Sequence, residues 1–146
     1  MRPEPILLVE DNADDIMFTI RAFRKNQVPN EIIVASDGVQ ALSMLLPEDG
    51  EPALSPILVL LDVKLPLVDG LEVLRRLRAD PRTRTMPVVV MTTSNEERDI
   101  VESYRLGANS FVRKPVGFAE FEDAAKTLSQ YWLRLNEPAP SWRGGG

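Results

Sequence analysis

The feature that most constrains the fold of this chain is a set of short apolar runs without polar alternation. Four of them are rich in β-branched or large aliphatic residues and span residues 6–9, 32–35, 57–61 and 88–91, with a weaker fifth at Phe111 and Val112. Strands of a parallel sheet are buried on both faces and read as continuous apolar runs, whereas half-exposed strands alternate. The runs therefore predict the strands of a buried parallel sheet.

Between the runs lie segments whose apolar residues recur at helical spacing. The first begins at Asn12, a favourable N-cap residue, and we interpret Asp14 and Asp15 as charges that stabilise its first turn. The others are expected at 39–46, 71–79, 96–106 and 118–135. Strand and helix thus alternate five times, which predicts an α/β fold with right-handed crossovers and helices on both faces of the sheet.

Composition and charge exclude several classes of protein. The chain has 146 residues without cysteine or histidine, so it holds no disulfide, no thiolate or imidazole metal site, no Ser-His-Asp or Cys-His hydrolase and no histidine kinase. Its net charge of −5 and its lack of a basic run argue against nucleic-acid binding. No apolar run approaches the roughly 20 residues that span a bilayer, and no signal peptide is visible. We therefore expect a cytoplasmic protein.

Polar side chains follow four of the apolar runs: Glu10 and Asp11, then Asp62, Thr92 and Lys114. The carboxyl ends of parallel strands meet at one edge, where open α/β sheets place their functional residues. Clustered carboxylates repel one another unless a cation neutralises them, and Mg²⁺ prefers oxygen ligands of this kind. A carboxylate beside Mg²⁺, a lysine ammonium and a hydroxyl are the groups that phosphoryl transfer requires.

Four motifs in register make the chain resemble the receiver domains of two-component response regulators. They are Leu-Val-Glu10-Asp11-Asn, the Leu-Leu-Asp62-Val-Lys-Leu-Pro66 loop with Asp69-Gly70, Val-Met-Thr92-Thr93-Ser94, and Phe111-Val-Arg-Lys114-Pro115. The resemblance implies a flavodoxin-like or CheY-like fold of three layers. In that fold five βα units form a doubly wound parallel sheet with strand order 2-1-3-4-5.

The resemblance also implies a role for each residue of the acidic edge. Asp62 would be the phosphoacceptor, and Glu10 and Asp11 would bind Mg²⁺ together with Asp62 and the backbone carbonyl of Lys64. Lys114 would pair with Asp62 or with the phosphoryl group. The phosphoryl group would come from a partner histidine kinase, because this chain has no histidine of its own.

Further residues would carry the signal away from the acidic edge. By the same resemblance, Thr92 would be the switch hydroxyl and Phe111 the aromatic side chain that moves with it. Lys64 and Ser94 occupy positions that tune the lifetime of the phosphoryl group in the family. The peptide bond between Lys114 and Pro115 would be cis.

A narrower resemblance is to single-domain response regulators paired with phytochrome-type histidine kinases. It rests on Glu10-Asp11-Asn12, on the polar loop before the third run, on Thr92-Thr93-Ser94 and on the long last helix. It implies a sensor histidine kinase as partner, with a bacteriophytochrome as one candidate. We expect a receiver domain over 1–136 and a flexible tail over 137–146, without room for a DNA-binding output domain.

The last predicted helix also indicates a partner surface. Its apolar positions should face the sheet at first, but a helix of about 19 residues outruns a short strand, so Trp132 and Leu135 should project beyond the sheet. Tyr131 lies on another face and should be exposed. The apolar positions are Phe118, Phe121, Ala125, Leu128, Trp132 and Leu135. Protruding apolar side chains predict a two-fold homodimer built on the fourth helix, fifth strand and fifth helix.

Three other interpretations stay open. An aspartate-nucleophile phosphatase needs a second aspartate where this chain has Lys64, and turnover of a generic phosphomonoester would favour it. A flavodoxin-like cofactor binder needs a phosphate-binding loop where Glu10-Asp11-Asn12 repels phosphate, and a yellow protein would favour it. A receiver that binds but never switches would show no phosphorylation of Asp62. We interpret the chain as a signalling phosphoacceptor and not as an enzyme.

Overall fold

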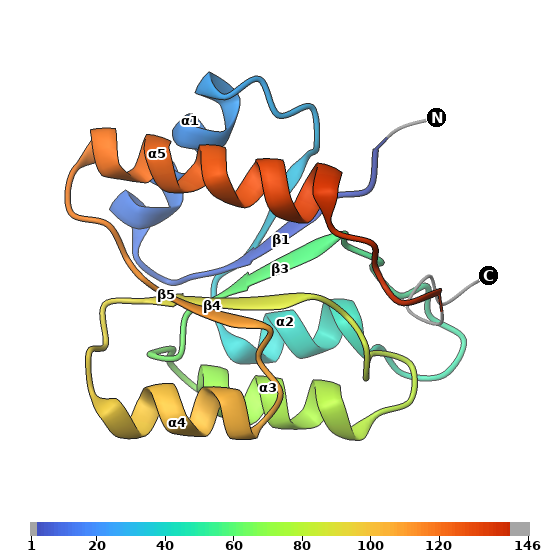
Figure 1. Cartoon of the computed structure of the whole chain (residues 1–146). Coiled ribbons are helices and arrows are strands. Elements are labelled where there is room, and N and C mark those ends of the chain that lie inside the picture. Colours follow the sequence, from blue (N-terminus) through green and yellow to red (C-terminus); the bar gives the residue numbers. More distant parts are fainter. Residues whose placement is uncertain (1–2, 141–146) are drawn as a thin grey trace.

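The computed structural model describes residues 3–140 and contains five parallel strands that alternate with helices (Figure 1). The strands form one sheet in the order β2-β1-β3-β4-β5, which confirms the predicted fold class and strand order. The strands are β1 (Ile6–Val9), β2 (Ile32–Ala35), β3 (Leu58–Leu61), β4 (Val88–Thr92) and β5 (Ser110–Arg113). The helices are α1 (Ala13–Lys25), α2 (Gly38–Leu45), α3 (Gly70–Ala79), α4 (Glu97–Arg105), α5 (Phe118–Leu128) and the π-helical segment η1 (Ser129–Leu135).

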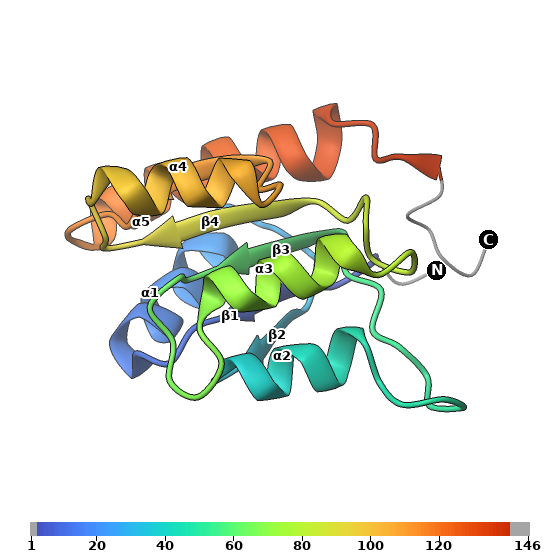
Figure 2. The ribbon, with the colours of Figure 1, turned by 90° about the horizontal axis from the view of Figure 1, so that it is seen from below.

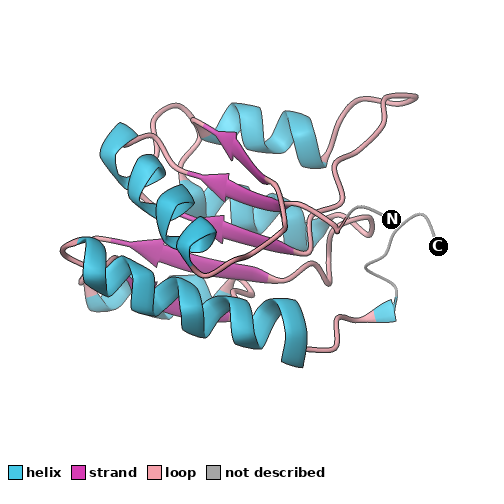
Figure 3. Ribbon diagram, turned by 90° about the horizontal axis from the view of Figure 1, so that it is seen from above, coloured by secondary structure: helices cyan, strands magenta, loops and turns pink. Residues whose placement is uncertain are grey.

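The sheet is the middle of three layers. Helices α1 and α5 cover one face, and α2, α3 and α4 cover the other (Figures 1 and 2). Successive residues of a strand point to opposite faces, so Ile6 and Leu8 join the core under α1 and α5. Leu7 and Val9 join the core under α2, α3 and α4. The strands run in one direction, so that all their carboxyl ends lie along the same edge (Figure 3).

Side-chain caps fix the start of the first three helices. Asn12 Oδ1 accepts a hydrogen bond from the Asp15 N–H at 3.0 Å, as expected of an N-cap residue. Asp37 and Asp69 cap α2 and α3 in the same way. The observed bounds of the helices and strands differ by only one or two residues from the predicted ones, except at the end of the last helix.

The last predicted helix changes its winding at Ser129. The α-helical part ends at Leu128, and η1 continues as a π-helix with a hydrogen bond from the Asn136 N–H to the Tyr131 carbonyl at 2.6 Å. The wider turn rotates the later side chains relative to a regular α-helix. Trp132 is half-buried against the core under α1 and α5, so the prediction that it projects from the sheet is wrong. Tyr131 and Leu135 are 46% and 72% exposed, as predicted.

Two further sequence predictions concern the C-terminal tail and membrane-spanning segments. Residues 141–146 of the predicted flexible tail lie outside the described residues, so that part stays a prediction. Over residues 3–140, no helix combines the length and the apolar character that crossing a membrane requires.

Candidate functional site

The carboxyl edge of the sheet brings four of the predicted side chains into direct contact. Glu10 follows β1, Asp62 follows β3, Thr92 ends β4 and Lys114 follows β5. Because the strands are parallel and adjacent, their ends converge although Glu10 and Lys114 are far apart in the sequence. The four side chains form one connected polar cluster at the end of an apolar sheet.

Lys114 is the centre of this cluster. Its ammonium donates hydrogen bonds to Glu10 Oε1 at 2.6 Å, to Asp62 Oδ2 at 2.9 Å and to Asp15 Oδ2 at 2.9 Å. Its side chain is only 5% exposed. Burial alone would lower the pKa of Lys114, but the three hydrogen bonds outweigh burial and raise that pKa above its usual value. Lys114 is therefore a permanent positive charge against the carboxylates.

Asp62 is held from two sides. Its Oδ1 accepts a hydrogen bond from the Thr92 hydroxyl at 2.7 Å and another from the Lys64 N–H at 3.0 Å, while its Oδ2 meets Lys114. Asp62 and Thr92 are both buried. A buried carboxylate is stable only when it is paired in this manner, and the result is a single, fixed orientation of the Asp62 oxygens.

Glu10 is the most deeply buried of the carboxylates in the cluster. Its Oε2 accepts hydrogen bonds from the N–H groups of Asp11 and Asn12, each at 3.1 Å. Burial raises the pKa of Glu10 from 4.5 to about 7, against the lowering effect of the hydrogen bond from Lys114, and the nearby Asp62 raises it further. A cation next to Glu10 would favour its charged form.

The same edge has the composition of a site for a divalent cation. Glu10, Asp11 and Asp62 each offer a carboxylate oxygen, and these oxygens lie within 4.8 Å of one another. Asp11 is exposed, so the cluster opens to solvent at that residue. A hard divalent cation with carboxylate and water ligands fits this donor set. The role of the Lys64 carbonyl as a further ligand stays a prediction.

Two residues that make contacts around the site were not predicted from the sequence to do so. Asp15 contacts Lys114 directly, although we interpreted it only as a charge at the start of a helix. Its position in the first turn of α1, directly after the β1–α1 loop that holds Glu10 and Asp11, was the available signal. Asp99, in the first turn of α4, accepts a hydrogen bond from the Ser94 hydroxyl and lies 3.4 Å from the Lys64 ammonium.

The predicted switch residue Phe111 lies apart from the polar cluster. Its ring packs against the core under α2, α3 and α4, and its N–H donates to the Tyr104 hydroxyl at 3.1 Å. Tyr104 is 49% exposed on α4. Phe111 therefore connects the sheet to the outer surface of α4, while its part in switching stays a prediction.

One family feature is absent. The peptide bond between Lys114 and Pro115 is trans, as are the other peptide bonds of the described residues, so the expected cis bond is a wrong prediction for this structure. Trans is the lower-energy form for most bonds before proline.

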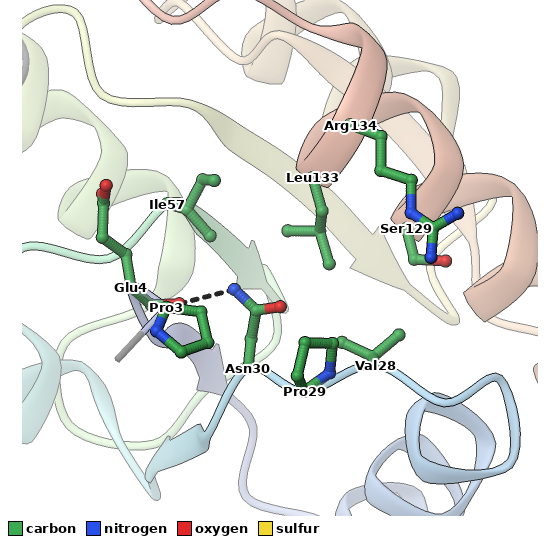
Figure 4. A pocket seen from close by; sticks show the side chains of 9 residues that line it. All are labelled: Pro3, Glu4, Val28, Pro29, Asn30, Ile57, Ser129, Leu133 and Arg134. Carbon is green, nitrogen blue, oxygen red and sulfur yellow. Dashed lines mark hydrogen bonds between the residues drawn. The ribbon is translucent and has the colours of Figure 1, made fainter. Parts of the chain in front are cut away.

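A hollow lies at the amino ends of the strands, opposite the end that holds the polar cluster (Figure 4). It has a volume of about 330 Å³ and lies between η1 and the segments that precede β1, β2 and β3. Val28, Pro29 and Leu133 give it an apolar lining, and Asn30 Nδ2 donates to the Glu4 carbonyl beside it at 2.7 Å. It shares no residue with the acidic cluster and takes no part in the site.

Comparison with known proteins assigns the family. The family model described as "response regulator receiver domain" matches residues 6–126. The chain is 39% identical over 140 residues to the probable methanogenesis regulatory protein FilR2 of Methanothrix harundinacea, covering 95% of this chain and 90% of that protein. It is 33% identical over 132 residues to response regulator Rcp1 of Synechocystis, covering 90% of each.

Solved structures agree with this assignment. The Mn²⁺-bound form of Rcp1 superposes with a TM-score of 0.84 at 31% identity, over 94% of this chain and 99% of that one. The bacteriophytochrome response regulator AtBRR is 47% identical with a TM-score of 0.70, over 92% of this chain and 98% of that one. The chain therefore belongs to the response regulator receiver domain family of two-component signalling, with a CheY-like fold, phytochrome-associated relatives and the part of a signalling phosphoacceptor rather than an enzyme.

Proposed function

We propose that Asp62 accepts a phosphoryl group from a phosphohistidine of a partner sensor histidine kinase, in a reaction that depends on Mg²⁺. The observation that carries this proposal is the fixed Asp62 carboxylate between Lys114 and Thr92, beside the acidic cluster with Glu10 and Asp11. The sequence contains no histidine, so the donor must be another chain.

The chemistry requires one bond to form and one to break. A carboxylate oxygen of Asp62 attacks phosphorus, and the P–N bond of the phosphohistidine breaks. Its electron pair returns to the ring nitrogen, and the imidazole leaves in its neutral form because its second nitrogen carries a proton. The Lys114 ammonium and the Thr92 hydroxyl stabilise the negative charge on the phosphoryl oxygens. Mg²⁺, held by Glu10, Asp11, Asp62 and the Lys64 carbonyl, would neutralise charge on those same oxygens.

The output of the reaction is a change at the surface formed by α4, β5 and α5. Thr92 would shift its hydroxyl toward the phosphoryl group, and Phe111 would change its packing in response. The exposed Tyr104, Tyr131 and Leu135 lie on or next to this surface and would contribute to a two-fold homodimer. Sedimentation of the protein at about 100 μM, with and without phosphorylation, measures that association.

The relatives support a class of partner for this chain. The bacteriophytochrome response regulator AtBRR supports a phytochrome-type histidine kinase as partner in a phosphorelay. The Mn²⁺ in the Rcp1 structure supports a divalent cation at the acidic edge. We assign the receiver domain to residues 1–136, a tail to 137–146, and the cytoplasm as the compartment in which the kinase would be met.

The test is phosphotransfer from a histidine kinase to matched variants. Wild type should be labelled in the presence of Mg²⁺, and Asp62→Asn should not be, because an amide is a poor nucleophile. Asp49→Asn, which changes an exposed carboxylate far from the site, should be labelled like wild type. Label that persists in Asp62→Asn, or that forms fully in excess chelator, would refute the assignment of Asp62 and of the cation.

A further inference from the structure

A closed ring of contacts joins Asp62 to helix α4. On one side, the Lys64 N–H donates to Asp62 Oδ1 at 3.0 Å, and the Lys64 ammonium lies 3.4 Å from Asp99 Oδ2. On the other side, Thr92 donates to the same Asp62 oxygen at 2.7 Å and accepts from the Ser94 N–H at 3.3 Å. The Ser94 hydroxyl donates to the same oxygen of Asp99. Asp99 thus contacts Lys64, which is a direct partner of Asp62, and Ser94, which is a partner of Thr92.

Asp99 is fixed in the first turn of α4 and is only 7% exposed. Its N–H donates to the Glu96 carbonyl at 3.0 Å, and its carbonyl accepts from the Ser103 hydroxyl at 2.7 Å. The hydrogen bond from Ser94 lowers the pKa of Asp99, and the charge of Lys64 lowers it further. Asp99 is therefore an ionised carboxylate whose main side-chain partners both belong to the loops of the site.

The start of helix α4 lacks a side-chain cap on its N-cap residue. Helices α1, α2 and α3 each begin with a side-chain cap, whereas Glu96 at the start of α4 makes no side-chain cap hydrogen bond. The polar groups that tie the first turn of α4 to the rest of the protein are therefore those of Asp99 and Ser94. A change at Ser94 is transmitted directly to the start of the helix.

We infer that Asp99 is a positioning residue that holds Ser94 and Lys64 in place around unphosphorylated Asp62 and releases Ser94 when Asp62 is phosphorylated. The inference rests on the proposed function, because only a phosphoryl group on Asp62 would move Thr92. That group places its acceptor oxygens beyond the carboxylate, so the Thr92 hydroxyl leaves Asp62 Oδ1 for one of them. Ser94 follows Thr92 by two residues and is drawn away from Asp99, which frees the first turn of α4.

The surroundings of Asp99 allow this release. A hollow of about 370 Å³ lies between the β3–α3 loop and α4 and is lined by Lys64, Leu65, Leu71 and Asp99 among others. The Lys64 side chain is 54% exposed, so it can leave Asp99 and move through this space without disturbing the core. The ring can therefore open at the contact between Ser94 and Asp99, with Lys64 free to follow, while the apolar layers stay packed.

The first experiment uses the unphosphorylated protein and hydrogen exchange of the amides of residues 94–99. Ser94→Ala and Asp99→Ala should each raise exchange there about fivefold, the effect of losing one hydrogen bond of about 1 kcal/mol. The double variant should show no more exchange than Asp99→Ala alone, because Asp99→Ala already removes the contact with Ser94. Glu102→Ala removes an α4 carboxylate that pairs with Arg105 and should leave this segment unchanged. Additive effects in the double variant would overturn the contact.

The second experiment adds acetyl phosphate and Mg²⁺, and measures both the labelling of Asp62 and the exchange of residues 94–99. Phosphorylation of wild type should raise exchange in this segment, and Ser94→Ala, which keeps the Lys64–Asp99 pair, should be labelled about fivefold faster because its resting state is less stable. Labelling of wild type without a change in exchange would overturn release and leave the proposed function intact. Absence of labelling of wild type by both acetyl phosphate and a phosphorylated histidine kinase would refute the proposed function, and with it release, while the first experiment still decides the resting contact.

Discussion

Two loops supply carboxylates to the site, and they are fixed in different ways. The β1–α1 loop, residues 10–12, is short and is ordered by polar caps. Glu10 accepts hydrogen bonds from the two N–H groups that follow it, and Asn12 caps α1. Glu10 Oε2 and Asn12 Oδ1 meet their partners within three residues, so these contacts are specified by local sequence, whereas Glu10 Oε1 reaches the distant Lys114.

The β3–α3 loop, residues 62–69, is longer and is ordered by backbone contacts at glycines. A side chain on Gly70 would meet the backbone of Asp62 and Val63, and a side chain on Gly38 of α2 would meet the carbonyl of Val68. Leu67 in the same loop has a φ of +67°, a backbone conformation that residues other than glycine rarely adopt. This loop thus depends on the absence of a side chain at Gly70, which follows it, and at the distant Gly38, and it contains backbone strain at Leu67.

The largest expected effect comes from a side chain at Gly70. Gly70→Ala places a methyl group 2.6 Å from Val63 Cα, against backbone that has no room to move, and should lower the free energy of unfolding by about 3 kcal/mol. The displaced loop also carries Asp62, so phosphorylation should slow markedly. Urea unfolding and the rate of labelling measure the two effects.

Gly50→Ala is the matched control for Gly70→Ala. Gly50 has a φ of +87° but open space around its Cα, so this change should cost only the conformational strain, about 1 kcal/mol. It should leave phosphorylation unaffected. Equal losses of stability in the two variants would mean that the β3–α3 loop does not depend on close backbone contact at Gly70.

The difference between the loops explains how much of the site was predictable. Glu10, Asp62, Thr92 and Lys114 were predicted to converge because each follows an apolar run and parallel strands end at one edge. That argument needs only the strands and their direction. The structure confirms the convergence, while the chemical role of each residue rests on the proposal above.

Contacts made by the first turns of helices were not predictable in the same way. Asp15 and Asp99 reach the site because α1 and α4 pack at particular angles on the sheet, which hydrophobic spacing does not specify. Trp132 was placed wrongly because the length of a helix relative to a strand does not show whether its last turns pack back on the core. The sequence pattern predicts the helices and strands, whereas the rotation of each of them about its axis depends on packing.

The next effect concerns the charge of the β1–α1 loop. Asp11→Asn should weaken Mg²⁺ binding about tenfold or more, since it removes one of three clustered carboxylates. Without Mg²⁺ the same change should raise the free energy of unfolding by about 0.5 kcal/mol, because it relieves repulsion at an exposed site. Titration calorimetry and thermal unfolding with and without Mg²⁺ measure both.

Asp14→Asn controls for the loss of a negative charge near the start of α1. Asp14 is exposed in the first turn of α1 and lies outside the carboxylate cluster. The Asp14→Asn variant should therefore keep wild-type Mg²⁺ affinity, and its free energy of unfolding should fall slightly. Unchanged Mg²⁺ affinity in Asp11→Asn, or metal-free stability below that of Asp14→Asn, would show that this loop is not a crowded acidic pocket.

The smallest effect concerns the strain in the β3–α3 loop. Leu67 is 79% exposed, so replacing it costs little burial. Leu67→Gly removes about 1–2 kcal/mol of strain from the left-handed backbone of the folded protein. The added flexibility of glycine stabilises the unfolded chain by about 0.5–1 kcal/mol. The free energy of unfolding should therefore rise by about 0.5 kcal/mol. Leu67→Ala shortens the side chain but keeps the strain, so it should match wild type in urea unfolding. A glycine variant no more stable than the alanine variant would mean that the loop stores no strain at Leu67, and the contrast with the β1–α1 loop would then rest on Gly70 and Gly38 alone.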